Sequence, residues 1–314
     1  MQRTAIIFPG QGAQSVGMGR DVHDVSAAAR AVFQRANKAM AFDLAAVCFG
    51  GPAEVLERTD IQQPAIFVVS VAIWEAMREA GATLESYAMT AGLSLGEYTA
   101  LHVAGAIDFD DAVRLVALRG RLMQAAAVAS PSGMVSLIGA DEAAAGALCA
   151  AVRQGDVLAP ANFNCPGQIV ISGHAAACRR AVAQAGSMGL RAISLPVAGA
   201  FHSSLMQSAA DALRSALDQV TIRDLKIPVI ANVDAKNHQD AGAIRKSLRE
   251  QITHPVLWQK SVERMIADGV QRFVEVGPGR VLTGLMRKIN RKVEAINVST
   301  ADAVAAMVAQ PTAT

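Results

Sequence analysis

The sequence contains a serine between two glycines, in a pattern typical of enzymatic nucleophiles. Residues 92–96 read GLSLG and place Ser94 at the centre of a Gly-x-Ser-x-Gly motif. An apolar run at 88–93 predicts a strand before the serine, and residues 96–103 predict a helix after it. In this context the glycines permit a tight turn that lifts the hydroxyl clear of the sheet, and the helix N-terminus supplies free N–H groups. Ser94 is therefore a candidate nucleophile; the alternative is a serine that only caps the helix.

A serine nucleophile needs a base, and histidine is the usual one. Of the six histidines, His202 lies in an apolar, glycine-containing segment, VAGAFHSS at 197–204, just before a predicted helix. His202 is either the base or a partly buried histidine with a structural role. The other five are expected in exposed polar segments (His23, His238), on a helix face directed away from the motif (His102), at a helix start (His174) and in a loop (His254).

The elements that must position these residues alternate between strands and helices, which indicates an α/β fold. Strands are expected at 5–8, 88–93, 228–231, 272–276 and 294–298, and helices at 27–40, 62–80, 96–103, 109–127 and 203–219. Between 130 and 197 the expected order is βαββαβ, the ferredoxin-like unit. We therefore predict a large α/β-hydrolase-like domain with a parallel central sheet, residues 1–129 and 198–314, and an inserted small ferredoxin-like domain, residues 130–197. The last residues, around Pro311, are expected to fray.

The composition excludes several classes of protein. The 314 residues include 29 basic and 27 acidic side chains, so the basic excess of a nucleic-acid-binding protein is missing. A turn within the longest charge-free stretch, 122–140, argues against a membrane span, and the first residues lack the apolar core of a signal peptide. No C-x-x-C pair suggests a metal site or a disulfide framework, and we expect a cytoplasmic enzyme.

Seven motifs occur in a recognisable order along the chain. They are FPGQGAQ at 8–14, GLSLGEYTA at 92–100, RGRLMQ at 119–124, NCPGQIVISG at 164–173, GAFH at 199–202, QITHPV at 251–256 and EVGPG at 275–279. With these motifs, over roughly residues 5 to 290, the chain resembles the malonyl-CoA:acyl carrier protein transacylases and the related acyltransferase domains of fatty-acid and polyketide synthesis.

The resemblance implies a catalytic role for five of the matching residues. Ser94 would carry the acyl group, and His202 would be its general base. The backbone carbonyl of Gln251 would orient the imidazole, in place of the carboxylate of a catalytic triad. The backbone N–H groups of Gln11 and Leu95 would form the oxyanion hole.

Two further residues would select the acyl group. Arg119 would bind the free carboxylate of a malonyl group, because a guanidinium matches a carboxylate with two parallel hydrogen bonds. Without the resemblance, Arg119 would be interpreted as a solvent-exposed helix arginine. Phe201 would limit the room at the α-carbon and favour an unbranched extender. One residue departs from the family pattern: Leu93 stands where the family usually has histidine, which puts the packing of the serine turn in question.

The implied reaction has two halves and needs no metal or redox cofactor. Ser94 would attack malonyl-CoA to give a malonyl-serine ester and CoA, and the phosphopantetheine thiol of an acyl carrier protein would then take the malonyl group. We expect a monomer without nucleic-acid or membrane partners. Carrier proteins of this kind are acidic, so we expect the carrier to dock on a basic patch. The alternative is that these basic residues only form a solvated helix face. The patch consists of Arg280, Arg287, Lys288, Arg291 and Lys292.

Three alternatives stay open on the sequence. An acyl-thioester serine hydrolase would share Ser94 and His202 but would favour acyl chains without a carboxylate. A non-catalytic scaffold of a synthase complex is suggested by Leu93 alone. A trans-acting polyketide acyltransferase with another extender unit would carry the same motifs as an enzyme of fatty-acid synthesis.

Overall fold

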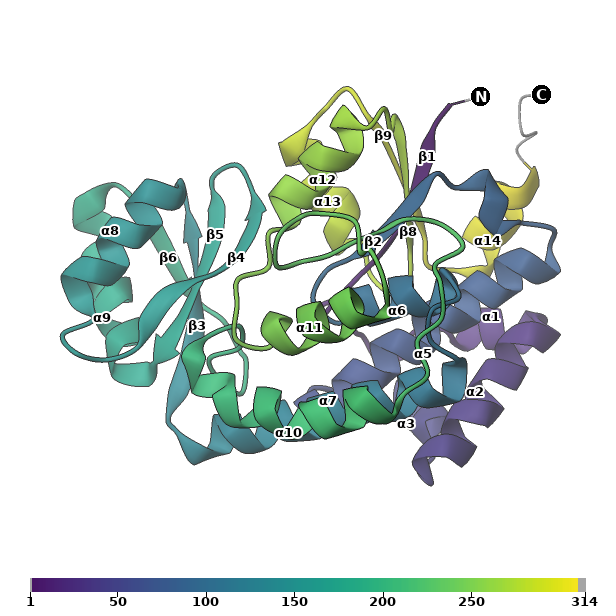
Figure 1. Cartoon of the computed structure of the whole chain (residues 1–314), viewed down its shortest axis with the longest axis horizontal. Coiled ribbons are helices and arrows are strands. Elements are labelled where there is room, and N and C mark those ends of the chain that lie inside the picture. The colour runs from purple at the N-terminus through teal and green to yellow at the C-terminus, as the bar shows by residue number, and fades with distance from the viewer. Residues whose placement is uncertain (1, 310–314) are drawn as a thin grey trace.

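The strands of this protein form two separate sheets (Figure 1). The computed structural model describes residues 2–309, so the fraying expected around Pro311 lies outside the described residues. The strands are β1 (Thr4–Phe8), β2 (Met89–Gly92), β3 (Ser132–Ile138), β4 (Leu158–Cys165), β5 (Gln168–His174), β6 (Arg191–Ser194), β7 (Val229–Ile230), β8 (Arg272–Val276) and β9 (Glu294–Val298). The helices are α1 (Arg20–Val25), α2 (Ala27–Met40), α3 (Leu44–Gly50), α4 (Ala53–Leu56), α5 (Thr59–Glu79), α6 (Gly96–Val103), α7 (Phe109–Ala129), α8 (Glu142–Val152), α9 (Ala175–Ala185), α10 (Gln207–Gln219), α11 (Ala241–Gln251), α12 (Trp258–Ala267), α13 (Val281–Ile289) and α14 (Ala301–Ala309).

The central sheet has the strand order β7-β2-β1-β8-β9, and all its pairs are parallel. Helices cover both of its faces, which is why β1 consists entirely of buried residues. Successive side chains of a strand point to opposite faces. Ala5 and Ile7 accordingly pack with α12 and α13, whereas Ile6 and Phe8 join the larger core that contains α5. Because β1 and β2 are parallel neighbours, with Phe8 paired to Gly92, their carboxyl ends lie side by side. The serine turn directly follows β2.

The second sheet is antiparallel, with the order β4-β5-β3-β6, and its chain order is β3-α8-β4-β5-α9-β6. Alternation again separates two faces. Val135 and Ile171 pack beneath α8 and α9, whereas Met134 and Val170 face the opposite side and line a cleft. One side of this sheet thus forms a wall of the site described below.

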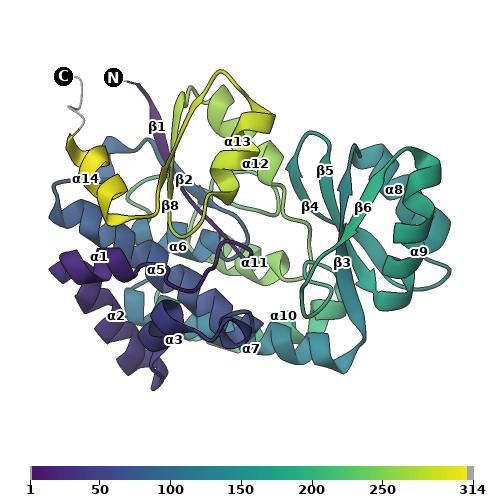
Figure 2. The same ribbon diagram turned by 180° about the vertical axis from the view of Figure 1, so that it is seen from behind.

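Packing joins the two sheets, and hydrogen bonds tie the antiparallel sheet to the segment that follows α11. Figure 2 shows α12 and α13 between the two sheets. The amide of Val256 donates to the carbonyl of Ala161 in β4, and the amide of Phe163 donates to the carbonyl of Val256, both at 2.9 Å. Val256 follows closely after the end of α11, so edge strand β4 is tied to the segment that contains Gln251.

The strands predicted from the sequence are present, and the fold has the expected central parallel sheet and separate antiparallel sheet. Boundaries differ: α5 begins at Thr59 rather than at residue 62, and β7 contains only two residues. The sequence analysis missed α1, α3, α4 and the helices α11 to α14, most of which are short. Among residues 2–309, none of the helices combines the length and the apolar character that crossing a bilayer requires.

Candidate functional site

Ser94 occupies a tight turn between β2 and α6 with a left-handed backbone, φ +52°. A non-glycine residue adopts this conformation only where its surroundings impose it. Here the side chain of Asn232 accepts a hydrogen bond from the Ser94 amide (2.6 Å) and donates one to the Gly92 carbonyl (2.8 Å). A Cβ atom on Gly92 would overlap the backbone of Gly96, and one on Gly96 would overlap the carbonyl of Phe8. Only glycine therefore fits on either side of the serine.

The hydroxyl of Ser94 contacts the imidazole of His202, the residue favoured from the sequence. Its Oγ lies 2.8 Å from Nε2 of His202, and Nδ1 of His202 lies 2.7 Å from the carbonyl oxygen of Gln251. A carbonyl can only accept, so Nδ1 carries the hydrogen and Nε2 is free to accept the serine proton. Both side chains are buried, with exposed fractions of 7% for Ser94 and 5% for His202. The arrangement is a serine–histidine pair oriented by a main-chain carbonyl.

The environment keeps His202 neutral. Burial, and secondly the positive charge of Arg119, lower the pKa of His202 to about 4, although the hydrogen bond to Gln251 acts in the opposite direction. An imidazole with this pKa is unprotonated at pH 7. It is therefore in the state that a general base requires.

Arg119 is buried, with an exposed fraction of 1%, and is not the surface arginine that helix α7 alone would suggest. Its Nη2 donates to Ser94 Oγ (3.0 Å) and to Gln251 Oε1 (2.9 Å), and its Nη1 donates to Gln63 Oε1 (2.6 Å). The guanidinium also lies over the ring of Tyr98, 5.4 Å from the centroid, which is a favourable position for a cation. Burial lowers the pKa of Arg119, but an arginine stays charged. A fixed positive charge thus touches the nucleophile.

A cleft of about 180 Å³ opens over these groups and is lined from both sheets. Gln11, from the loop after β1, lies on its wall with Leu95 and Phe201. That loop approaches the serine turn so closely that a Cβ atom on Gly10 would overlap the carbonyl of Leu93. In the described part of the chain, the backbone N–H groups of Gln11 and Leu95 have no hydrogen-bond acceptor. Both are therefore free to stabilise an oxyanion beside Ser94.

Leu93, the departure from the family pattern, lies at the same cleft. Its side chain is half-buried and packs against the apolar cluster of α12 and α13. An apolar residue here continues the apolar wall formed by Val281 and Leu285 of α13.

Three residues beneath the serine turn were not singled out from the sequence: Glu97, Asn232 and His238. The expectation that His238 is exposed was wrong, because its side chain is 1% exposed and its Nε2 lies 2.9 Å from Oε1 of Glu97. His238 lies in a run of polar residues after β7, which is typical of a surface loop, and nothing local marks it as buried. For Glu97 a signal existed, because it directly follows the second glycine of the GLSLG motif.

The remaining histidines lie outside the site. His102 contacts the carbonyl of Ile107, His23 packs against Phe33 and Phe49, and His254 is exposed. His174 is the residue that precedes α9, as the sequence indicated, and its Nδ1 accepts from the Val157 amide.

The basic patch is exposed throughout and lies on and around α13. The first turn of this helix lines the cleft, and its last turn carries Arg287 and Lys288. No carboxylate in the described part of the chain lies within ion-pair distance of the five patch residues.

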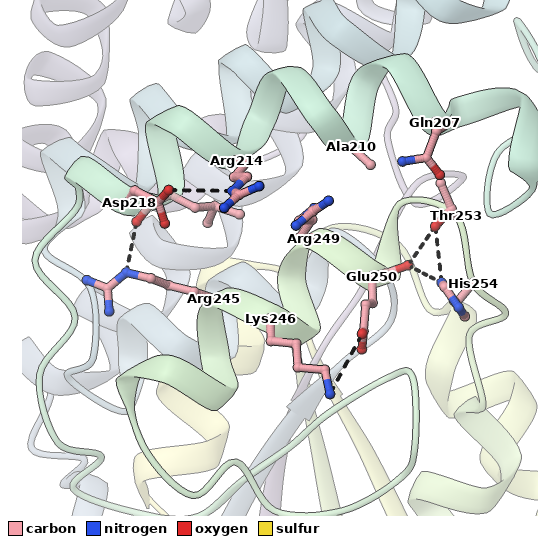
Figure 3. A pocket seen from close by; sticks show the side chains of 11 residues that line it. Gln207, Ala210, Arg214, Asp218, Arg245, Lys246, Arg249, Glu250, Thr253 and His254 are labelled. Carbon is pink, nitrogen blue, oxygen red and sulfur yellow. Dashed lines mark hydrogen bonds and ion pairs between the residues drawn. The ribbon is translucent and has the colours of Figure 1, made fainter.

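A second, larger hollow of about 400 Å³ lies between α10 and α11 (Figure 3). It contains four cationic side chains, each with a partner already. These are Arg214 with Asp218, Lys246 with Glu250, Arg249 with Asp211, and Arg245 with the carbonyls of Leu217 and Val220. Three of the four cations thus lie within ion-pair distance of a carboxylate, and Arg245 is held by two main-chain carbonyls. Across residues 2–309, no three side chains of the metal-binding types come together as a metal site would require.

Comparison with known proteins agrees with this geometry. The sequence model of the acyl transferase domain family matches residues 5–311 of this chain. The malonyl CoA-acyl carrier protein transacylase of Salmonella typhimurium is 45% identical over 290 residues, 92% of this chain and 93% of that protein. The enzyme of the same name from Bacillus subtilis is 42% identical over 301 residues, 95% of this chain and 94% of that protein.

Solved structures give the same result. An acyl carrier protein S-malonyltransferase from Vibrio cholerae superposes with a TM-score of 0.93 at 42% identity, over 97% of this chain and 99% of that one. A malonyl-transacylase bound to its type II polyketide synthase acyl carrier protein superposes with a TM-score of 0.94 at 40% identity, over 98% and 99%. The chain with the Ser94 turn and the buried Arg119 belongs to the acyl transferase domain family.

Proposed function

We propose that this acyltransferase moves the malonyl group of malonyl-CoA to the phosphopantetheine thiol of an acyl carrier protein, for chain extension in fatty-acid or polyketide synthesis. One observation carries the proposal: Ser94 Oγ touches both a neutral imidazole (2.8 Å) and a buried guanidinium (3.0 Å). In a malonyl group a single methylene separates the carboxylate from the reacting carbonyl. A cation beside the nucleophile is therefore placed to bind that carboxylate.

The proposed first half begins when Ser94 Oγ attacks the thioester carbonyl and His202 Nε2 takes the hydroxyl proton. The N–H groups of Gln11 and Leu95 would stabilise the oxyanion. Collapse of the tetrahedral intermediate breaks the carbon–sulfur bond, and His202 returns the proton to the sulfur of CoA. In the second half, the carrier thiol gives its proton to His202, its sulfur attacks the malonyl-serine ester, and Ser94 regains its proton.

Arg119 favours transfer of malonyl groups over hydrolysis of simple acyl thioesters. A hydrolase for uncharged acyl chains would place an uncompensated cation against an apolar group, which is costly in a buried site. The ring of Phe201 lines the same cleft and would leave little room for a substituent at the α-carbon. We therefore propose an unbranched malonyl extender as the substrate.

The carrier protein would dock on the basic patch, because α13 connects the patch directly to the cleft. We further propose the domain division predicted from the sequence, with residues 130–197 as an inserted ferredoxin-like domain on an α/β-hydrolase-like body. The βαββαβ order and the antiparallel sheet support it. We also propose a monomer in a reducing cytoplasm, for the second of which the four free cysteines are the support.

The test is acyl transfer followed by mass spectrometry. Incubation with malonyl-CoA should add one malonyl group to Ser94, and a holo carrier protein should remove it. Ser94→Ala should abolish the adduct, and His202→Ala should slow its formation by orders of magnitude. An adduct on another residue would contradict the assignment of the nucleophile. Release of malonate at the same rate without a carrier would identify a hydrolase instead.

A further inference from the structure

A buried carboxylate lies directly beneath the serine turn and has no part in the reaction described above. Glu97, in the first turn of α6, has an exposed fraction of 0%. Its Oε2 accepts from Nε2 of Gln251 (2.6 Å) and from the amide of Asn232 (3.2 Å), and its Oε1 contacts Nε2 of His238 (2.9 Å). Two of these groups can only donate, and the imidazole nitrogen must donate to a carboxylate. Glu97 therefore acts as an acceptor for three donors at once.

The residues that Glu97 holds are the ones that hold Ser94. Asn232 accepts from the Ser94 amide (2.6 Å), and Nε2 of Gln251 donates to the Ser94 carbonyl (2.9 Å). The backbone carbonyl of Gln251 also orients His202. One carboxylate thus connects to both sides of the nucleophile turn and, through a single residue, to the base.

Glu97 also determines which way the Gln251 amide faces. Nε2 must point to the carboxylate, so Oε1 points to Arg119 and accepts from its Nη2 (2.9 Å). Burial lowers the pKa of Arg119, and the negative charge of Glu97 opposes part of this shift. The position of the Arg119 guanidinium does not depend on this contact alone, because its Nη1 also donates to Gln63 Oε1 at 2.6 Å.

We propose that Glu97, oriented by His238, is a positioning residue that keeps Ser94 and His202 in reacting geometry through Asn232 and Gln251. It touches neither the acyl group nor the base. The proposal rests on the proposed function only in requiring that Ser94 reacts with the help of His202.

The informative variant is Glu97→Gln, which keeps the shape of the side chain. Its NH₂ group cannot accept and the negative charge is lost, so either Gln251 and Asn232 lose their acceptor or His238 must change to the tautomer that accepts at Nε2. We expect the rate of Ser94 acylation at saturating malonyl-CoA to fall about ten- to a hundred-fold, the effect of one charge-assisted hydrogen bond, with KM nearly unchanged. The ratio of the malonyl-CoA to the acetyl-CoA acylation rate should stay the same. Both substrates react with the same Ser94–His202 pair, and Gln63 still holds Arg119.

A fluorophosphonate probe separates this inference from the proposed function. The probe forms a bond between Ser94 Oγ and phosphorus, releases fluoride and leaves the serine proton on His202, without any use of Arg119, CoA or carrier. We expect Glu97→Gln to be labelled about ten- to a hundred-fold more slowly than wild type. If wild type is labelled at Ser94 but is not acylated by malonyl-CoA, the proposed function fails while this comparison still stands.

Glu275→Gln is the matched control. Glu275 is equally buried and accepts from the amides of Leu282 and Thr283 and from the Thr283 hydroxyl, but it does not contact Ser94 or the groups that hold it. Its variant should lose thermal stability and keep the wild-type labelling rate. Equal slowing in both variants, or wild-type labelling of a folded Glu97→Gln, would overturn the proposal.

A second pair of variants decides the case if Glu97→Gln does not fold. His238→Ala removes the donor to Oε1 of Glu97, whereas His238→Gln offers an amide donor in its place. We expect slow labelling for the alanine variant and recovery of much of the rate for the glutamine variant. Identical rates for the two variants would contradict a role for the contact between His238 and Glu97.

Discussion

Arg119→Ala is the substitution that most directly tests how the acyl group is selected. In the free protein Nη2 of Arg119 already donates to Ser94 Oγ and Gln251 Oε1. A bound malonyl carboxylate would replace one of these acceptors and add one new hydrogen bond to the guanidinium. We therefore count one net charge-assisted hydrogen bond rather than two, about 1.5–3 kcal/mol, or roughly ten- to a hundred-fold in kcat/KM for malonyl-CoA. Acetyl-CoA has no carboxylate and should lose much less.

The same substitution should change the pH dependence in a defined direction. The charge of Arg119 is one of the causes that lower the pKa of His202 to about 4, so removing it raises this pKa. Because burial is the larger cause, the pKa stays below the ordinary value of about 6.5. The acid limb of kcat/KM for acetyl-CoA should therefore move to higher pH in Arg119→Ala.

The assay is the initial rate of Ser94 acylation by each donor between pH 4 and 8, followed by mass spectrometry. Arg114→Ala is the matched control, because Arg114 lies on the same helix α7 but is exposed and, among residues 2–309, pairs only with Asp111. Arg119→Lys should recover only part of the malonyl rate, since an ammonium cannot form two parallel bonds. An unchanged malonyl-to-acetyl ratio in Arg119→Ala would refute the assignment of Arg119 as the carboxylate-binding residue.

Three further outcomes are expected. Charge reversal of the basic patch (Arg280, Arg287, Lys288, Arg291 and Lys292) should slow transfer to the carrier but not acylation by malonyl-CoA, and the effect should shrink as the Debye length falls from about 10 Å at 0.1 M salt to about 3 Å at 1 M; equal carrier kinetics at low salt would contradict docking there. Leu93→His should lower the free energy of unfolding by about 1 kcal/mol, because the half-buried imidazole replaces apolar contacts with the cluster of α12 and α13; a variant as stable as wild type in denaturant titration would show that the polar side chains of the cleft hold the imidazole equally well. Gly96→Ala should abolish folding or sharply lower the melting temperature, because its Cβ overlaps the Phe8 carbonyl, whereas Gly146→Ala in α8, where space is open, should stabilise by about 0.5–1 kcal/mol; similar melting curves for the two would contradict the close approach.

The sequence was most informative where short-range patterns determine structure. Buried parallel strands such as β1 are continuous apolar runs, and the glycines on either side of Ser94 have a steric reason that is visible in the motif itself. Helices α11 to α13 were missed although they are as long as α6 and α8, which were predicted, and carry their apolar residues on one face; the pattern that predicts them was present in the sequence.

The site was only partly predictable for a different reason. His202 stood out because an apolar segment surrounds it, but the polar run around His238 conceals that β7 and α6 bury it against Glu97. Burial of Arg119 likewise depends on Gln63 and Gln251, which approach from other helices. Contacts of this kind depend on tertiary packing, which no local window of sequence records.

The contacts of Ser94 extend far along the chain, and this has a consequence for the time at which the protein becomes reactive. The serine meets His202 across 108 residues, Asn232 across 138 and Gln251 across 157. Closing loops of this length costs conformational entropy before any contact stabilises them, so such contacts form late in folding. On the ribosome, a nascent chain that already contains the Ser94 turn still lacks its base and the groups that impose its backbone conformation. The nucleophile therefore stays inert until synthesis has passed Gln251 and the segment from Ser94 to Gln251 has folded, so acyl-enzyme formation reports that these distant segments have come together.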